Sequence, residues 1–206
     1  MYYCSKCNKL ACTSGDSNNY PKTCPSHQFT QEQIDELYNT DDNMKLAYNS
    51  ALVEAEGYCN KTRLEETIDF MNKCGYQKIG LAFCMGLKEE ALILTDILEH
   101  KGFEIHSVIC KTGGFAKRSV GIKDNEKIKG QEDNAMCNPI GQALLLNDEK
   151  VDFTIIFGLC VGHDTLLIKH IESPCTVLVV KDRVLCHNPI GAIYQASAYY
   201  KKKLYK

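Results

Sequence analysis

Four cysteines lie within the first 24 residues in the spacing Cys4-x2-Cys7-x4-Cys12-x11-Cys24. The surrounding stretch is polar and rich in turn-forming residues, so burial of apolar side chains cannot order it. Four thiolates are the ligand set of a tetrahedral zinc ion or of a cubane iron–sulfur cluster. The spacing therefore predicts a small metal-binding knuckle over residues 1–30. A disulfide pair or free thiols are the alternatives.

The spacing leaves the metal of this knuckle open. The two-residue gap between Cys4 and Cys7 suits zinc, whereas the dipeptide Cys24-Pro25 is similar to the end of bacterial ferredoxin cluster motifs. His27 can replace one thiolate, although a surface histidine is the simpler interpretation. Zinc and an iron–sulfur cluster are therefore both hypotheses for the N-terminal site.

Cysteine is the outlying residue type of the whole chain, with 12 in 206 residues. This usage is below that of small disulfide scaffolds but far above that of an ordinary cytosolic enzyme. The first residues, Met-Tyr-Tyr-Cys-Ser-Lys, lack the apolar stretch of a signal peptide, so we expect a cytoplasmic protein with reduced thiols. In a reducing compartment, grouped thiols indicate metal binding.

Charge and hydropathy argue against two classes of partner. Lys and Arg number 24 against 26 Asp and Glu, so no nucleic-acid partner is expected. The longest run of apolar residues and glycine, over 155–162, is far below the roughly 20 residues of a membrane span. The lysines at 201–203 are interpreted as solvated, so no membrane partner is expected. Nucleotide redox, NTP hydrolysis and zincin chemistry lack their motifs.

The apolar pattern predicts an α/β domain over residues 31–206, with a helical lead-in over 41–74. Apolar residues recur every three or four positions over 41–57 and 62–73, as in helices, and short apolar strands then alternate with helices. This alternation is typical of an open parallel sheet with helices on both faces, of the Rossmann or flavodoxin-like kind. We expect four strands, in the spatial order 2-1-3-4, at 78–83, 103–110, 153–157 and 176–180. The remaining helices are expected at 87–101, 139–146, 164–170 and 189–199.

The connector over residues 111–136 is too long for a plain loop. It contains Gly113-Gly114 and ten charged residues. Long connectors inside compact domains are usually functional. We interpret it as a functional loop or lid, with a short strand near Val120.

Three of the four predicted strands end in a cysteine. Cys84 and Cys160 follow the first and third strands, each in a Cys-x-Gly string, and Cys110 ends the second. The carboxyl ends of parallel strands meet at one edge of the sheet, where ligands bind near the point at which strand order reverses. Three thiols are therefore expected to converge at this edge.

Cys137 is a fourth candidate for the same edge. Asn138 after it is a good N-cap, and Pro139 suits the first helical position. A thiolate at a helix N-terminus has a lowered pKa, which favours metal binding or nucleophilic chemistry. The string His187-Asn188-Pro189 repeats this turn, with Cys186 just ahead of it.

These four thiols predict a second metal site, with a [4Fe–4S] cluster as its expected cofactor. A single cysteine of this kind is usually a small buried hydrophobe. Four at one sheet edge favour a ligand set instead. The expected cofactor ligands are Cys84, Cys110, Cys137 and Cys160, while Cys59, Cys74 and Cys175 are interpreted as packing or loop residues.

Polar side chains follow the same strand ends and are the candidate catalytic residues together with Cys160. Helix capping and surface ion pairing also explain the acidic members. The cations and the glycine backbone can hold a small anionic ligand, and a histidine can transfer a proton or complete a metal shell. The candidates are His163, Asp164, Lys181 and Arg183, with Lys111, Asp182, His187 and Asn188 nearby in the predicted fold.

Four strings of the sequence resemble the domain-of-unknown-function family numbered 1847. They are GLCVGHD at 158–164, VKDRV at 180–184, HNP at 187–189 and MCNPI at 136–140. The resemblance covers nearly the whole chain and implies a cytosolic, cysteine-rich, metal-binding protein. It implies that Cys4, Cys7, Cys12 and Cys24 match the family's N-terminal cysteines and that Cys84, Cys110, Cys137 and Cys160 match its internal ones. Cys186 departs from the family's pattern, which has small residues other than cysteine there.

Three functions fit these residues. The first is an iron–sulfur protein that acts on or carries a small anionic or sulfur-containing ligand beside Lys181 and Arg183. The second is a non-catalytic zinc module that stores, senses or delivers metal or sulfur. The third is a thiol enzyme with Cys160 as nucleophile and His163 as base.

Overall fold

The computed structural model describes residues 2–130 and 133–206. Contacts between Cα atoms divide the chain into two compact units, Met1–Glu56 and Gly57–Lys206. The division into a knuckle over residues 1–30 and a larger domain over 31–206 stays a prediction.

The first unit begins with single turns of 3-10 helix and continues with two α-helices. The turns are Cys4–Lys6, Ala11–Thr13, Ser17–Asn19 and Pro25–Gln28. None of residues 2–30 is buried, as the polar composition predicts. Helix α1 (Gln31–Tyr38) begins at Thr30, whose side chain accepts a hydrogen bond from Gln33 in a capping box. Helix α2 (Asp41–Gly57) has the bounds that its apolar spacing predicts.

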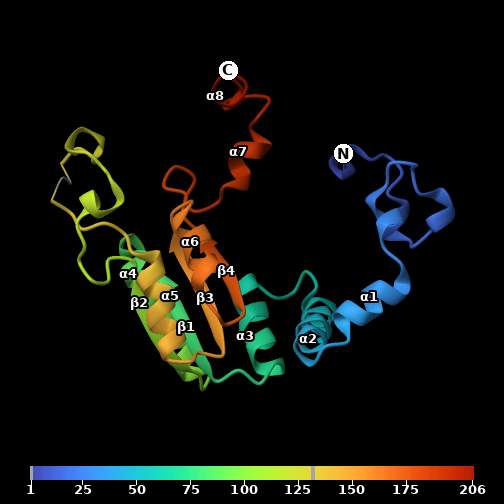
Figure 1. Cartoon of the computed structure of the whole chain (residues 1–206), viewed down its shortest axis with the longest axis horizontal. Coiled ribbons are helices and arrows are strands. Elements are labelled where there is room, and N and C mark those ends of the chain that lie inside the picture. Colours follow the sequence, from blue (N-terminus) through green and yellow to red (C-terminus); the bar gives the residue numbers. More distant parts are fainter. Residues whose placement is uncertain (1, 131–132) are drawn as a thin grey trace. The chain divides into compact units, whose positions relative to one another are not determined.

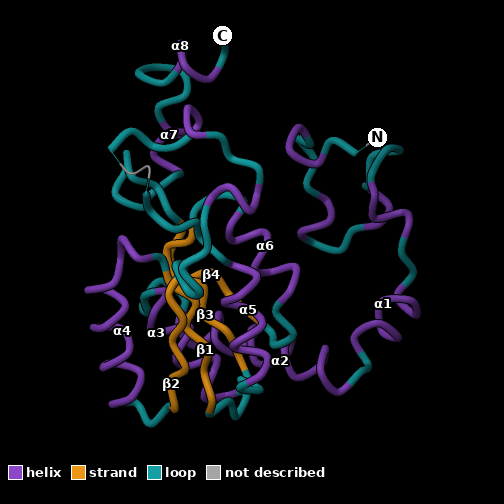
Figure 2. Tube along the Cα trace, turned by 60° about the vertical axis from the view of Figure 1, so that its left-hand side comes forward, coloured by secondary structure: helices purple, strands orange, loops and turns teal. Residues whose placement is uncertain are grey.

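The second unit is built on a four-stranded parallel sheet, as predicted. Its strands are β1 (Lys78–Phe83), β2 (Glu104–Ile109), β3 (Phe153–Leu159) and β4 (Cys175–Val180), in the spatial order β2-β1-β3-β4. The strands run side by side in Figure 2. The central strands β1 and β3 follow from short apolar runs, because strands covered on both faces expose few positions to water, whereas the edge strands β2 and β4 have no buried residue. All of β3 is buried.

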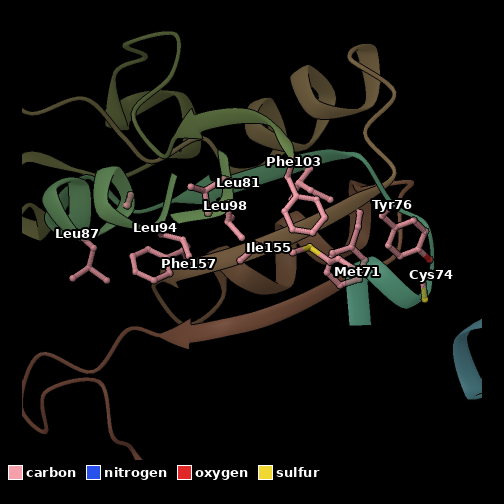
Figure 3. Packing of buried hydrophobic residues seen from close by; sticks show 13 residues of the cluster. Met71, Cys74, Tyr76, Leu81, Leu87, Leu94, Leu98, Phe103, Ile155 and Phe157 are labelled. Atoms are coloured by element: carbon pink, nitrogen blue, oxygen red, sulfur yellow. The ribbon is translucent and has the colours of Figure 1, made fainter. Parts of the chain in front are cut away.

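One face of the sheet is covered by α3 (Arg63–Lys73) and α4 (Lys88–His100). Met71 of α3 and Leu98 of α4 are fully buried there against Ile79 and Ile155. Figure 3 shows these two helices and the strands contributing side chains to one apolar layer. Burial of this layer is the main stabilising contribution on that face.

The other face is covered by α5 (Pro139–Asp148) and α6 (His163–His170) (Figure 1). Leu146 of α5 and Leu167 of α6 are fully buried, and they lie in one cluster with Ala82 and Ile156 of the sheet. Helices therefore lie on both faces, as the strand and helix alternation predicts.

The connector over residues 111–136 and the chain after β4 both leave the sheet at its carboxyl edge (Figure 1). The prediction of a short strand near Val120 is wrong. The chain there forms a 3-10 turn, Lys117–Val120, which ends at Gly121 with a φ of 79°. This stretch carries several charges and lacks the alternating apolar residues that would pack a strand against the sheet.

The last predicted helix, over residues 189–199, is shorter in the structure. It is α7 (Ile190–Tyr194), followed by turns and by α8 (Lys201–Leu204). None of α7 is buried, and a helix without a buried face has little to extend it. In the described part of the chain, no helix combines the length and apolar character that crossing a bilayer requires.

Candidate functional site

Strands β1 and β2 bring Cys84 and Cys110 together at the carboxyl edge of the sheet. The last residues of the two strands, Phe83 and Ile109, are paired in the parallel register. The Cys110 backbone N–H donates to the Phe83 carbonyl at 2.9 Å, so the residue after each strand is held as firmly as the strand. Cys84 and Cys110 are 8% and 2% exposed. Both thiols are therefore fixed in protein rather than in solvent.

The turn before α5 adds Cys137 to these two thiols. Asn138 donates its backbone N–H to the Cys110 carbonyl at 2.7 Å, and its side-chain oxygen caps the helix by accepting from Gly141 at 2.9 Å. A Cβ at Gly141 would collide with the Asn138 amide at 2.2 Å, so this turn requires glycine there. Cys137 Sγ lies 3.9 Å from Cys110 Sγ as a result.

A buried glutamine ties the two strands together just below the thiols. The Gln142 side chain is fully buried and donates to the carbonyls of Phe83 at 3.2 Å and Val108 at 2.7 Å. Its side-chain oxygen has no hydrogen-bond partner among the described residues. The sequence pattern did not predict a role for Gln142. The available signal is a lone polar residue in the apolar run of α5.

Cys110 is the central thiol of the cluster. Its hydrogen bonds with Cys137 and Cys84, together with its burial, raise the pKa of Cys110 far above that of a free thiol. The Cys110 thiol, the Gly86 backbone N–H and the charge of Lys181 lower the pKa of Cys84 to about 5 against the effect of burial. The Met85 backbone N–H also donates to Cys110 Sγ at 3.3 Å.

Cys137 lies between Cys110 and the imidazole of His163. Hydrogen bonds from the Cys110 thiol and from His163, and then the charge of Lys111, lower the pKa of Cys137 to about 4. The same bond raises the pKa of His163, although burial opposes it. The Lys111 ammonium group donates to the Ala135 carbonyl within the long connector. Two thiols inclined to ionise are thus surrounded by cationic groups.

Lys181 lies over Gly86, which follows β1, and over Gly158, the penultimate residue of β3. An added Cβ at Gly86 or Gly158 would lie 3.7 or 3.8 Å from Lys181 Nζ. The Lys181 backbone N–H donates to the Leu159 carbonyl at 3.2 Å, which fixes the start of this residue beside β3. Lys181 therefore contributes charge to the thiol cluster, as its effect on Cys84 indicates.

Cys160 lies at the same edge but contacts a different residue. Strand β3 loses its regular register with β4 around Gly158, which has a φ of 66°. Because of this break, Leu159 rather than residue 158 packs with Ile156 on the face of α5 and α6. Cys160 follows the break, and Arg183 donates to its Sγ at 3.1 Å. The hydrogen bond and charge of Cys160 raise the pKa of Arg183.

The remaining polar candidates shape turns near this edge. Asp164 accepts from the Thr165 backbone N–H at 2.8 Å in the first turn of α6. Asp182 accepts from two backbone N–H groups, those of Val184 at 3.0 Å and Leu185 at 2.9 Å. His187 Nδ1 accepts from the Asp182 backbone N–H at 3.0 Å. These bonds give both acidic side chains and His187 a role in local structure.

The four N-terminal cysteines line one cavity of about 320 Å³ within the first unit. Backbone N–H groups of Leu10 and Lys9 lower the pKa of Cys7. Leu10 has a φ of 46°, which is unusual for a residue with a side chain and turns the chain sharply after Cys7. His27 faces the Pro21 carbonyl at 3.2 Å and packs edge-on against Tyr20.

All twelve cysteines are free thiols. Within residues 2–130 and 133–206, no three His, Cys, Asp or Glu side chains are gathered closely enough to hold one metal ion. At the sheet edge the contacts run in pairs, from Cys84 to Cys110 to Cys137. The thiols are therefore neighbours without a common centre.

Comparison with known proteins identifies a family. The sequence profile of the protein of unknown function DUF1847 matches residues 22–178. The chain belongs to this family. It is also 49% identical over 201 residues to the uncharacterized protein MJ0455 of Methanocaldococcus jannaschii, covering 98% of this chain and 97% of that one. No solved structure matches.

The matched region of DUF1847 contains the whole thiol cluster and Cys160. Of the N-terminal set it contains Cys24 alone, because Cys4, Cys7 and Cys12 precede residue 22. The match to MJ0455 spans almost the full length of both chains. The expected family resemblance is thus confirmed.

Proposed function

We propose that this DUF1847 protein binds a single soft metal ion, zinc, through Cys84, Cys110 and Cys137, with His163 as the fourth ligand. The observation that carries this proposal is the position of Cys110, whose thiol contacts both other thiols. His163 contacts Cys137 at the end of the same chain of bonds. Three cysteines and one histidine are a common ligand set of structural zinc.

The spacing of the thiols suits one ion. In a tetrahedral site with zinc–sulfur bonds of about 2.3 Å, two ligand sulfurs lie about 3.8 Å apart. Cys110 Sγ and Cys137 Sγ are 3.9 Å apart. Thiolates of a cubane bind separate iron atoms and lie farther apart, because the cluster fills the space between them. This distance therefore favours a single ion over a cluster at this pair.

In this proposal the site closes by rotation of its side chains. The backbone at Cys110 and at Cys137 is already tied by the bond from Asn138. The pairwise contacts must become a shared centre, which needs Cys84 and His163 to turn toward the middle of the group. Lys181 and Lys111 would offset the negative charge that three thiolates bring, since their charges already act on Cys84 and Cys137.

The N-terminal cysteines are proposed as a second metal site. Cys4, Cys7, Cys12 and Cys24 line one cavity in a stretch with no buried residue. Metal binding supplies folding free energy to such coreless segments. Zinc is the metal we propose here too, with an iron–sulfur cluster as the alternative.

A [4Fe–4S] cluster is the second candidate for the internal site. It is favoured by the position of Cys160, which comes from β3, the strand next to β1, and reaches the same edge. A cluster held by Cys84, Cys110, Cys137 and Cys160 would lie beside Arg183 and Lys181. Those cations suit a small anionic or sulfur-containing ligand, which we propose as the partner in that case.

Metal analysis of single variants tests the proposal. Protein purified without oxygen should contain two zinc ions per chain and no acid-labile sulfide. Cys110→Ser should lose one zinc, and Cys160→Ser should lose none. Cys175→Ser is the matched control, because that half-buried thiol lies at the opposite end of the sheet.

Two results would refute the zinc site. Bound iron with matching sulfide that disappears in Cys160→Ser would support the cluster instead. Equal metal content in the wild type and in Cys110→Ser would show that the thiol cluster binds no metal.

A further inference from the structure

We propose that Cys110 and Cys137 form a reversible disulfide, which makes the edge of the sheet a redox-controlled site. The disulfide itself depends only on the geometry of these two thiols. Its consequence, the release of metal on oxidation, rests on the function proposed above, because the same two sulfurs would be metal ligands.

The two sulfurs are in van der Waals contact, and backbone hydrogen bonds hold the two residues beside each other. Cys137 Sγ lies 3.9 Å from Cys110 Sγ, and a disulfide needs about 2.05 Å. The Asn138 backbone N–H bonds to the Cys110 carbonyl at 2.7 Å, and the Asn138 side chain donates to the Thr112 carbonyl at 3.3 Å. These bonds hold the two ends of the connector beside each other, so the two thiols stay neighbours.

The pair also brackets the long connector. Cys110 directly precedes residues 111–136 and Cys137 directly follows them. A bond between them would close this segment into a covalent loop. Linking the ends of so long a segment restricts the unfolded chain, so the bond would add to the free energy of unfolding.

Exposure sets the order of the reaction. Cys137 is partly exposed, whereas Cys110 is 2% exposed. An incoming low-molecular-weight disulfide, such as oxidised glutathione, therefore meets Cys137 first. Cys110 lies behind it and acts as the resolving thiol.

The exchange has two balanced steps. The Cys137 thiolate attacks one sulfur of oxidised glutathione, its S–S bond breaks, and one glutathione thiolate leaves while a mixed disulfide forms. Cys110 then attacks Cys137 Sγ, the bond from Cys137 to glutathione breaks, and the Cys110 proton passes to the leaving sulfur, which departs as a second glutathione. Overall the two protein thiols are oxidised, and one molecule of oxidised glutathione is reduced to two of glutathione.

Cys84 is the competing partner for Cys110. It also contacts the Cys110 thiol, but it is only 8% exposed and precedes a different segment of the chain. Pairing of Cys84 with Cys110 would leave Cys137 as a free thiol and the connector open. The two pairings are thus chemically distinguishable.

Peptide mapping of the oxidised protein tests the pairing. Metal-free protein would be treated with oxidised glutathione, alkylated without reduction and digested with trypsin. Cleavage after lysine gives the peptides 79–88, 102–111 and 130–150, each with one cysteine of the cluster. We expect a link between peptides 102–111 and 130–150, which dithiothreitol removes.

Variants separate the two steps. Cys110→Ser should stop at a mixed disulfide, with one glutathione bound to Cys137. Cys175→Ser, the matched control, should form the same link as the wild type. A link between peptides 79–88 and 102–111, or an unlinked Cys110 after full reaction of Cys137, would overturn the proposed pair.

Metal release distinguishes this inference from the function on which it rests. In zinc-loaded protein, oxidation should release one zinc per chain at the rate at which the link forms. Release without the link would overturn the inference while leaving the zinc site intact. If the internal site takes up no zinc and the link still forms, the proposed function fails and the disulfide stands.

Discussion

One glycine decides which cysteines can share a face of the sheet. In a regular strand the side chains of residues 156, 158 and 160 would point to the same side. The positive φ of Gly158 breaks this alternation, and Leu159 takes the inward position instead. Cys160 then pairs with Arg183, while Cys84, Cys110 and Cys137 lie together.

Replacing Gly158 tests this account of the strand end. In Gly158→Ala, the new Cβ would lie 2.2 Å from Leu87 Cδ1. The alanine would also have to keep the φ of 66° that glycine has at this position. Backbone strain and overpacking together should lower the free energy of unfolding by about 2 to 4 kcal/mol. Urea unfolding followed by circular dichroism measures the change.

Gly162→Ala is the matched control for this prediction. Gly162 also has a positive φ, but nothing lies within 4 Å of an added Cβ. The free energy of unfolding of Gly162→Ala should therefore fall only by the cost of the strained backbone, about 1 to 2 kcal/mol. Equal losses in the two variants would mean that the contact with Leu87 does not matter.

The elements follow closely from sequence, because each has a local signal. Thr62 is the N-cap of helix α3: its side chain accepts from the Glu65 backbone N–H, and its own backbone N–H donates to the Glu65 carboxylate. The backbone N–H and hydroxyl of Thr62 lower the pKa of Glu65. The capping box therefore stabilises the helix most when this carboxyl is ionised.

A pH dependence of stability follows from this box. Because the folded pKa of Glu65 is lowered, its contribution is present above the unfolded pKa of about 4.3 and is lost as pH falls through the folded pKa. Between about pH 5 and pH 3, the free energy of unfolding should fall less steeply in Glu65→Gln than in the wild type. Thermal unfolding across this range measures it.

Glu66→Gln is the control, because it removes the neighbouring acidic side chain of the same turn and leaves the box intact. It should keep the steeper wild-type slope. Identical slopes in the Glu65 variant and the wild type would contradict the account.

The sequence predicted the sheet better than the site. Apolar runs were enough for the strand order, and the strand-end cysteines were enough for the contact between Cys84 and Cys110 but not for the position of Cys160. They were not enough for the partner of each thiol, because that depends on side-chain rotation and on the break at Gly158. Helix α1 was missed although Thr30 and Gln33 form a capping box, since its apolar residues are too few for a clear stripe.

At the scale of the whole molecule, the two units are ordered by different forces. The unit from Gly57 onward has two apolar clusters, one on each face of its sheet. Residues 2–30 have no buried side chain. Metal removal should therefore affect the N-terminal segment far more than the sheet.

Hydrogen exchange with mass spectrometry tests this difference. After treatment with a strong zinc chelator, we expect backbone amides within residues 2–30 to exchange at least tenfold faster, because the proposed metal supplies their folding free energy. Amides of β1 and β3 should keep their protection. Unchanged exchange in the N-terminal segment would contradict an N-terminal metal site.

Cys84, Cys110, Cys137 and His163 are proposed to bind one zinc ion. X-ray absorption at the zinc edge tests it most directly, on anaerobically purified protein in which Cys4→Ser and Cys7→Ser remove the N-terminal site. We expect three sulfur ligands at about 2.3 Å and one nitrogen ligand at about 2.0 Å from the zinc ion. A zinc ion with only oxygen and nitrogen ligands, or iron with sulfide in place of zinc, would contradict it.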